Sequence, residues 1–309
     1  MKTYIFDPIS PEALAYARSY LDVVCWDSSE IVNYANAEAV IVRTFKMTPM
    51  MIDQMPNLKI IAKHGVGVDN IDIPYAKSKG IRVTNTPTAN MNSVAELIIG
   101  LAFNCVRRIT QSQMAVLNGL EKNSPMYLSG YELAEKTLGL IGIGKIGMSV
   151  GKKLHDAFDM KIIAYDPFAT TDYCNSLGFA KTESLDELCS KGDIISVSVP
   201  LTKETRNMIA SREISLMKET AVLINTSRGG IVNEDDLYKA LKNHKIFGAA
   251  LDVFVQEPVR KNHPLLSCDN FIATPHNGAN TTDALIRMGI GAVDEIIRLK
   301  NGENPLSGL

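Results

Sequence analysis

The sequence predicts an α/β protein with two doubly wound parallel sheets, one in each of two domains. Short apolar runs alternate with amphipathic helical patterns along the chain, an order typical of parallel strands joined by right-handed crossovers. The chain has 309 residues, of which 46% are hydrophobic. This length and composition are sufficient for two domains with ordinary cores.

The smaller domain is expected within about the first 95 residues. Its expected strands are residues 3–6, 23–26, 40–42, 58–62 and 82–85. Ser10-Pro11 and Thr48-Pro49 each open a helical pattern, with proline at the first helical position, where its missing N–H costs no hydrogen bond. Strands that alternate with helices imply that this domain has a parallel sheet of its own.

A long helix is expected to begin at Ser93, because Ser93-Val-Ala-Glu96 matches a capping box. Apolar residues recur at helical spacing at positions 94, 97, 98, 101, 102, 105 and 109. This helix, about 25 residues long, exceeds what one domain needs. Its apolar stripe could be core, or it could join the domains and pack against a second copy of the chain. Together with the irregular segment 118–136, the helix favours a homodimer or larger homo-oligomer.

The second domain begins with an apolar run, 138–141, that reads as a buried parallel strand. It breaks into Gly142-x-Gly144-x-x-Gly147 and continues as a helical pattern to about residue 157. The first glycine permits a tight turn, the second lets a pyrophosphate approach the backbone, and the third lets the helix pack close to the strand. The helix N-terminus would then face the phosphates with free N–H groups.

A second strand, 161–165, ends at Asp166, which lies 24 residues after Gly142. This is near the spacing at which a carboxylate meets the ribose hydroxyls of NAD. Asp166 would repel the 2′-phosphate of NADP, and Pro167-Phe168 supplies no arginine to neutralise one. We therefore expect a dinucleotide site that binds NAD rather than NADP. The alternative is a glycine-rich turn that binds no ligand.

The remaining strands are expected at 194–199, 221–224, 248–251 and 271–273, separated by helical patterns such as 234–241. The last helix is expected from Asp283 to about Leu299, with Asn301-Gly302 as its C-cap signal.

Charged residues follow three of these late strands, at the edge where open α/β sheets bind ligands. Arg228 follows one strand, Asp252 and Glu257 follow the next, and His276 follows the last. An arginine can clamp a carboxylate with two hydrogen bonds. A histidine beside a glutamate is a poised acid/base, because the carboxylate stabilises the protonated ring. Ordinary surface charge at loop ends is the alternative for any one of them.

The smaller domain contributes a second candidate. Residues 65–67, Gly-Val-Gly, follow a strand, and such a turn exposes consecutive backbone N–H groups that can hold a carboxylate. His64 borders this turn and is a candidate for contact with a substrate. A plain strand-to-helix turn is the alternative.

Composition narrows the class of protein. A net charge of −2 offers no basic surface for nucleic acid. No window has the roughly 18 apolar residues of a membrane span, and the N-terminal apolar run is too short for a signal peptide. The five cysteines, at positions 25, 105, 174, 189 and 268, have no metal-binding spacing and suggest reduced thiols in the cytoplasm. We expect no metal.

Four motifs together resemble the signatures of the D-isomer-specific 2-hydroxyacid dehydrogenases. They are Gly142–Gly147, Thr226-Ser-Arg-Gly-Gly-Ile-Val232, Ala250-Leu-Asp-Val-Phe-x-x-Glu-Pro258 and Thr274-Pro-His-Asn-Gly278. Residues 64–72, His-Gly-Val-Gly-Val-Asp-Asn-Ile-Asp, resemble the phosphoglycerate-dehydrogenase-like branch of that family. The similarity extends over nearly the whole chain.

The resemblance implies a Rossmann nucleotide-binding domain at 99–282 and a flavodoxin-like substrate domain at 1–98 plus 283–309. It implies that Arg228 binds the carboxylate and C2 oxygen of a small 2-hydroxy acid. Glu257 would orient His276 and raise its pKa, and His276 would exchange a proton with the C2 hydroxyl during hydride transfer.

The resemblance further implies that the turn at Val66–Gly67 holds the substrate carboxylate. Asp252 and the Thr226 carbonyl would bind the nicotinamide amide, and Val94 would pack on that ring. The expected cofactor contacts are Val94, Gly142, Gly144, Lys145, Ile146, Gly147, Asp166, Val199, Pro200, Thr205, Thr226, Asp252 and Gly278. The expected substrate contacts are Lys63, His64, Gly65, Val66, Gly67 and Arg228.

Some positions depart from the family pattern. Lys63 stands where the phosphoglycerate branch usually has arginine, and His64 stands where a small residue is common. We expect no regulatory domain after Leu309, and therefore no feedback control by serine. The other function considered is a non-catalytic NAD(H)-sensing protein of the same fold; the set of Arg228, Glu257 and His276 favours the enzyme. Formate dehydrogenases usually have glutamine in place of Glu257.

Overall fold

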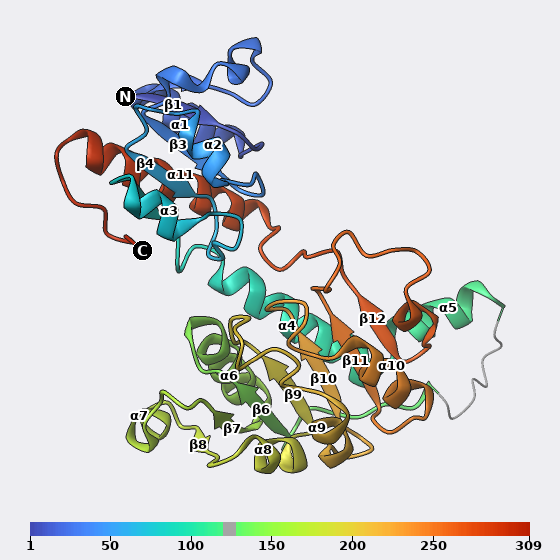
Figure 1. Cartoon of the computed structure of the whole chain (residues 1–309). Coiled ribbons are helices and arrows are strands. Elements are labelled where there is room, and N and C mark those ends of the chain that lie inside the picture. Colours follow the sequence, from blue (N-terminus) through green and yellow to red (C-terminus); the bar gives the residue numbers. More distant parts are fainter. Residues whose placement is uncertain (120–127) are drawn as a thin grey trace. The chain divides into compact units, whose positions relative to one another are not determined.

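The computed structural model describes residues 1–119 and 128–309, which form two compact units (Figure 1). Unit 1 comprises residues 1–93 and 279–309, and unit 2 comprises residues 94–278. Each unit has one parallel sheet, as the alternating pattern predicts. The assignment of unit 1 to substrate and of unit 2 to cofactor stays a prediction.

Unit 1 contains a five-stranded sheet with the order β2-β1-β3-β4-β5, in which every neighbouring pair is parallel. The strands are β1 Lys2–Ile5, β2 Asp22–Val24, β3 Ala39–Val42, β4 Ile60–Lys63 and β5 Arg82–Thr84. This is the flavodoxin-like order. The central strands β3 and β4 are buried along their whole length, because helices cover both faces of the sheet.

The helices of unit 1 are α1 Pro11–Tyr20, α2 Pro49–Asp53, α3 Ile73–Ser78 and α11 Thr282–Lys300, with the 3₁₀ turns η1 Ser29–Val32 and η2 Tyr34–Asn36. Helices α1 and α2 begin at Pro11 and Pro49 as predicted, and the hydroxyls of Ser10 and Thr48 cap them. Ala292, Val293 and Ile296 of α11 pack in one core with α1 and β1. The last helix of the chain therefore completes the core of the N-terminal unit.

The predicted long helix is two helices. Helix α4 spans Met91–Arg107 and α5 spans Ile109–Leu117, because Arg108 adopts a left-handed φ of 49° and ends the first helix. Ser93 lies inside α4, so the capping-box interpretation is wrong: the helix starts two residues earlier, after a turn in which Met91 N–H bonds Thr88 O. The apolar stripe of α4 is core of unit 2. Within segment 118–136, residues 120–127 lie outside the described residues.

Unit 2 contains a seven-stranded sheet with the order β12-β11-β10-β9-β6-β7-β8, again with parallel neighbours. Its strands are β6 Thr137–Ile141, β7 Lys161–Tyr165, β8 Ala180–Lys181, β9 Ile194–Val197, β10 Val222–Asn225, β11 Gly248–Leu251 and β12 Phe271–Ala273. The strand order reverses between β6 and β9, the point at which sheets of this type bind dinucleotides.

The helices of unit 2 besides α4 and α5 are α6 Lys145–Phe158, α7 Thr171–Ser176, α8 Leu185–Lys191, α9 Ser211–Leu216 and α10 Glu234–Lys242, with the 3₁₀ turn η4 Pro264–Ser267. Two apolar cores cover the two faces of the sheet. All five cysteines of the chain are buried free thiols. Within the part of the chain that is described, no helix is long and apolar enough to cross a membrane.

Candidate active site

The glycine-rich turn joins β6 to α6. Gly142 has a φ of 87°, and a Cβ there would lie 2.7 Å from Val199 Cγ1. A Cβ on Gly147 would lie 2.3 Å from Gly142 O, whereas a Cβ on Gly144 would meet open space. The first and third glycines are therefore required by packing, and the second leaves the backbone open to a ligand. No side chain caps the start of α6, where Lys145 and Ile146 form its first turn.

Asp166 lies at the end of the neighbouring strand β7 and is tied to this turn. Its Oδ2 accepts a hydrogen bond from Ile143 N–H (3.1 Å), and its Oδ1 accepts one from Phe168 N–H (2.9 Å). A carboxylate can accept about four hydrogen bonds, so acceptor positions remain for ribose hydroxyls. An open glycine, an uncapped helix of fourteen residues and this carboxylate fit a bound NAD.

The predicted contacts after β9 form one turn beside the glycines. The hydroxyl of Thr205 donates to Pro200 O (2.6 Å) and accepts from Thr202 N–H (2.8 Å). Because Val199 packs on Gly142, this turn borders the glycine-rich turn. Thr226, another predicted contact, immediately follows β10.

The loop that carries Arg228 is held by Asn225, whose side chain is buried. Asn225 Oδ1 accepts from both the N–H and the hydroxyl of Ser227 (3.0 and 2.7 Å), and its Nδ2 donates to Arg228 O (2.9 Å). Gly229 packs on the next loop, since a Cβ there would lie 2.1 Å from Phe254 O. Asn225 and Ser227 were missed by the sequence reasoning, although a polar Asn-Thr-Ser run after a strand is a turn signal.

His276 and Glu257 form the predicted pair. The Nδ1 of His276 donates to Glu257 Oε2 (2.8 Å), and Glu257 Oε1 accepts from Phe254 N–H (3.0 Å). His276 has a left-handed φ of 53°, held by bonds from its N–H to Asp252 O and Thr274 O. The ring is half-exposed, and its Nε2 is the nitrogen left for a substrate proton.

The hydrogen bond that His276 donates to Glu257 raises the pKa of His276, and the charges of Glu257 and Asp252 add to this, while burial and the nearby Arg228 act against it. Burial would raise the pKa of Glu257, but the hydrogen bonds from His276 and Phe254 and the positive charges of His276 and Arg228 hold it below its usual range. Both directions favour a charged pair, which is what a general acid/base near neutral pH requires.

Asp252 is fully buried after β11 and organises the loop that carries the histidine. Its Oδ1 accepts from the Thr274 hydroxyl and from Asn277 N–H (both 2.6 Å), and its Oδ2 accepts from Gly278 N–H (2.9 Å). Val94 lies against this loop, since a Cβ on Gly278 would be 3.3 Å from Val94 Cγ2. The structure thus brings Val94, Asp252 and Gly278 together; their contact with nicotinamide stays a proposal.

In unit 1, the Gly65–Gly67 turn follows β4, and two of its carbonyls accept hydrogen bonds from the residues just after β5. Gly65 O accepts from Thr86 N–H (2.9 Å), and Val66 O accepts from Asn85 Nδ2 (2.9 Å). The N–H groups of Val66 and Gly67 have no hydrogen-bond partner among the described residues. Two adjacent free N–H groups fit the predicted carboxylate site.

Lys63 and His64, at the end of β4, point away from each other. The Lys63 ammonium is buried and donates to Arg43 O (2.6 Å) and Asn70 Oδ1 (2.5 Å), so it binds neighbouring loops. The His64 ring lies by α11, 3.7 Å from a Cβ built on Gly289. Burial lowers the pKa of His64 to about 4, and neither ring nitrogen has a hydrogen-bond partner within the described chain.

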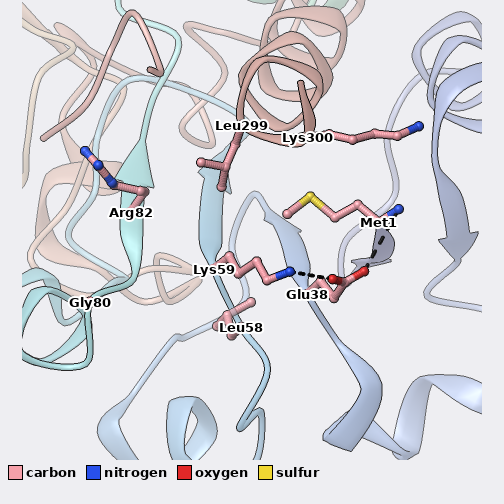
Figure 2. A pocket seen from close by; sticks show the side chains of 8 residues that line it. All are labelled: Met1, Glu38, Leu58, Lys59, Gly80, Arg82, Leu299 and Lys300. Carbon is pink, nitrogen blue, oxygen red and sulfur yellow. Dashed lines mark hydrogen bonds and ion pairs between the residues drawn. The ribbon is translucent and has the colours of Figure 1, made fainter. Parts of the chain in front are cut away.

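A pocket of about 420 Å³ lies elsewhere, at the amino-terminal ends of β3, β4 and β5. Its lining includes Lys59, Arg82 and Lys300 but none of the predicted site residues. Figure 2 shows that these cations do not converge: Lys59 pairs with Glu38 (2.7 Å), and the side chains of Arg82 and Lys300 extend away from that pair. This pocket is therefore separate from the candidate active site.

Known proteins resemble the chain along its length. A family model described as "D-isomer specific 2-hydroxyacid dehydrogenase, NAD binding domain" matches residues 99–278. The D-3-phosphoglycerate dehydrogenase of Methanocaldococcus jannaschii is 43% identical over 269 residues, which cover 87% of this chain and 51% of that protein. The glyoxylate reductase of Thermofilum pendens is 39% identical over 315 residues, which cover 98% of this chain and 93% of that protein.

The chain thus spans about half the length of the first of these relatives and nearly all of the second. A crystal structure of a Thermus thermophilus protein aligns with a TM-score of 0.91 at 31% identity, with 100% of both chains covered. These similarities include the dinucleotide turn and the loops that carry Arg228, Glu257 and His276. The chain therefore belongs to the D-isomer-specific 2-hydroxyacid dehydrogenase family of NAD-dependent oxidoreductases.

Proposed function

We propose that the chain catalyses the reversible NAD-dependent reduction of a small 2-oxo acid to its 2-hydroxy acid. The hydrogen bond of 2.8 Å between His276 and Glu257 carries this proposal, because a histidine paired with a carboxylate after strands of the sheet that includes the dinucleotide turn supports an acid/base role. When bound, the nicotinamide ring supplies or accepts the hydride at C2 of the substrate.

In the reduction, His276 would deliver the proton from Nε2 to the C2 oxygen as C2 gains its hydride. Glu257 stabilises the protonated ring of His276 before the proton is transferred. Because Nδ1 is bound to the Glu257 carboxylate, Nε2 faces the substrate. Arg228 would bind the substrate carboxylate and the C2 oxygen through its planar fork, which draws electron density from C2. In the oxidation, His276 takes the hydroxyl proton back.

The carboxylate would also bind the free N–H groups of Val66 and Gly67 in unit 1. Arg228 is in unit 2, whereas the 65–67 turn is in unit 1.

We further propose that the substrate is an unphosphorylated acid such as glyoxylate. Lys63 occupies a position at which the phosphoglycerate branch usually has arginine, but its ammonium is buried and bound to Arg43 O and Asn70. A lysine already held in this way is a poor ligand for a phosphate, because its hydrogen bonds would have to be broken first.

A substrate panel tests both proposals. NADH oxidation is measured with glyoxylate, pyruvate, hydroxypyruvate, 2-oxoglutarate, 2-oxoisocaproate and phosphohydroxypyruvate. We expect the highest kcat/KM with one of the small unphosphorylated acids. A higher kcat/KM with phosphohydroxypyruvate would contradict the substrate proposal alone. NADH binding without turnover of any of these acids would contradict the enzymatic proposal and favour an NAD(H)-sensing protein.

We propose that the chain forms a homodimer through α5. Four large apolar side chains on this helix and its end are at least half exposed: Ile109, Met114, Val116 and Leu117. Apolar side chains of this size are usually buried inside a fold. Their exposure on one helix therefore indicates that another copy of the chain covers them. Light scattering should give a dimer, and Val116→Glu with Leu117→Glu should give monomers. A monomeric wild type at micromolar concentration would contradict the proposal.

A cytoplasmic location is also proposed, because five buried cysteines that all remain free thiols suit a reducing compartment. Cell fractionation in the source organism tests it, and recovery of the protein outside the cytoplasm would contradict it.

A further inference from the structure

The segment that follows α11 folds back onto the open edge of the sheet in unit 1. Gly308 forms an antiparallel bridge with Thr84, and Leu309 N–H donates to Val83 O (2.9 Å). Strand β5 is the edge strand of this sheet, so the segment covers part of its unpaired backbone. This register brings Ser307 beside Asn85, at the point where the chain leaves β5.

Hydrogen bonds, and not the burial of apolar side chains, hold this C-terminal segment in place. Leu306 is 75% exposed, and its backbone N–H donates to Glu295 Oε2 of α11 (2.9 Å). The hydroxyl of Ser307 lies 2.6 Å from Asn85 O and 2.9 Å from Glu295 Oε1. One hydroxyl proton serves one acceptor at a time, and the shorter contact is with Asn85. Glu295 is buried, so these bonds also offset the cost of removing its carboxylate from water.

Asn85 continues the connection to the proposed carboxylate turn. Its Nδ2 donates to Val66 O (2.9 Å). Val66 C=O and Gly67 N–H belong to one planar trans peptide group, in which they point in opposite directions. A side chain that holds the carbonyl therefore fixes the direction of the N–H. Thr86 has the same effect one peptide earlier, since its N–H holds Gly65 O and so orients Val66 N–H.

We propose that Ser307 and Glu295 are positioning residues for substrate binding: through Asn85 they set the direction in which Gly67 N–H is presented to the substrate carboxylate. This inference rests on the proposed function, since it assumes that the 65–67 turn binds that carboxylate. Neither residue touches the substrate itself. Glu295 holds the backbone of Leu306, the Ser307 hydroxyl donates to Asn85 O, and Asn85 Nδ2 donates to Val66 O, through hydrogen bonds of 2.6 to 2.9 Å.

The test is steady-state kinetics of Ser307→Ala with the best acid of the panel. Loss of one hydrogen bond of this kind corresponds to about 2-fold to 10-fold in an equilibrium constant. We expect KM for the acid to rise by that factor while KM for NADH stays as in the wild type. Ser307→Thr keeps the hydroxyl and should restore the acid KM, and Glu295→Gln should raise it.

Ser78→Ala is the matched control, because it removes an exposed hydroxyl that donates to a backbone carbonyl of the same unit (Ser78 to Tyr75 O, 2.7 Å). It should leave both KM values unchanged. Fluorescence of Trp26, which packs in the core of unit 1, reports whether each variant is folded. An unchanged acid KM in Ser307→Ala, or equal rises in the KM of acid and NADH, would overturn the inference.

The variant Asn85→Ala tests the role of Ser307 separately from the proposed binding of the carboxylate by the 65–67 turn. If Asn85→Ala raises the acid KM and folded Ser307→Ala does not, the role of Ser307 is wrong and the carboxylate turn stands. If neither variant changes the acid KM of an active enzyme, the 65–67 turn does not bind the carboxylate. If the wild type reduces no acid, the proposed function fails and this inference fails with it.

Discussion

His64 should make the stability of unit 1 depend on pH between its ordinary pKa of 6.5 and about 4. Its side chain is 2% exposed, and burial is the main reason that its pKa falls from 6.5 to about 4. The positive charges of Arg43 and Lys63 act in the same direction. The nearby polar backbone groups of His64 and Leu285 act against it but are outweighed.

The sign and size of the effect follow from proton linkage. Between pH 6.5 and about 4 the unfolded chain binds a proton at this ring and the folded chain does not, so the free energy of unfolding falls as the pH falls. The contribution is fully present above pH 6.5 and fully lost below about pH 4. The whole difference is about 3 kcal/mol, of which about 2 kcal/mol is lost between pH 6.5 and pH 5.

Denaturant unfolding followed by Trp26 fluorescence measures this effect. Trp26 is the single tryptophan of the chain and packs in the core of unit 1, so its signal reports the unit that contains His64. His64→Leu removes the titrating ring while filling similar space, and it should abolish most of the loss between pH 6.5 and pH 5. Val83→Ala is the control: it should lower stability at every pH and keep the slope. A His64→Leu variant with the slope of the wild type would refute the argument.

Four further predictions concern unit 2. His276→Ala should keep NADH affinity and lower kcat by about 10²-fold or more, as expected for a lost general acid; a drop of less than 10-fold would exclude His276 as the proton donor. Glu257→Gln removes the interaction that raises the pKa of His276, so the limb of the pH–rate profile for reduction should move to lower pH, and an unmoved limb would contradict the pairing. Asp166 should give NADH a higher kcat/KM than NADPH, and the reverse order would contradict its role. Asp252→Asn should weaken binding of NADH but not of ADP-ribose, which lacks nicotinamide; equal weakening of both would assign Asp252 to loop structure only.

The strands and the catalytic loops could be predicted from sequence because both depend on local patterns. Apolar runs between turn signals located the central strands, and β7, β11 and β12 have the predicted bounds. Arg228, Glu257 and His276 each follow a strand, and parallel topology places the ends of adjacent strands at one sheet edge. The contact between Glu257 and His276, with the charge of Arg228 nearby, therefore followed from strand order, without any knowledge of side-chain packing.

The rest depends on partners that no local pattern reveals. Ser93 matches a capping box, but α4 already starts at Met91, after a turn closed by the hydrogen bond from Met91 N–H to Thr88 O. Arg108 interrupts the helical stripe with a left-handed residue, although arginine has no preference for that conformation. Ser307 binds Asn85 across 222 positions of sequence. Lys63 was a candidate substrate ligand by position, and only the structure shows which carbonyls hold its ammonium.

The Asp252 carboxylate supports its loop with three hydrogen bonds and still has an acceptor position that a ligand could use. A carboxylate offers about four acceptor positions. Thr274, Asn277 and Gly278 fill three of them and fix the loop that presents His276. One position is left, enough for one N–H of a carboxamide. We propose that this remaining position binds an amide N–H of a ligand, because a buried carboxylate is stabilised by each hydrogen-bond donor that it gains.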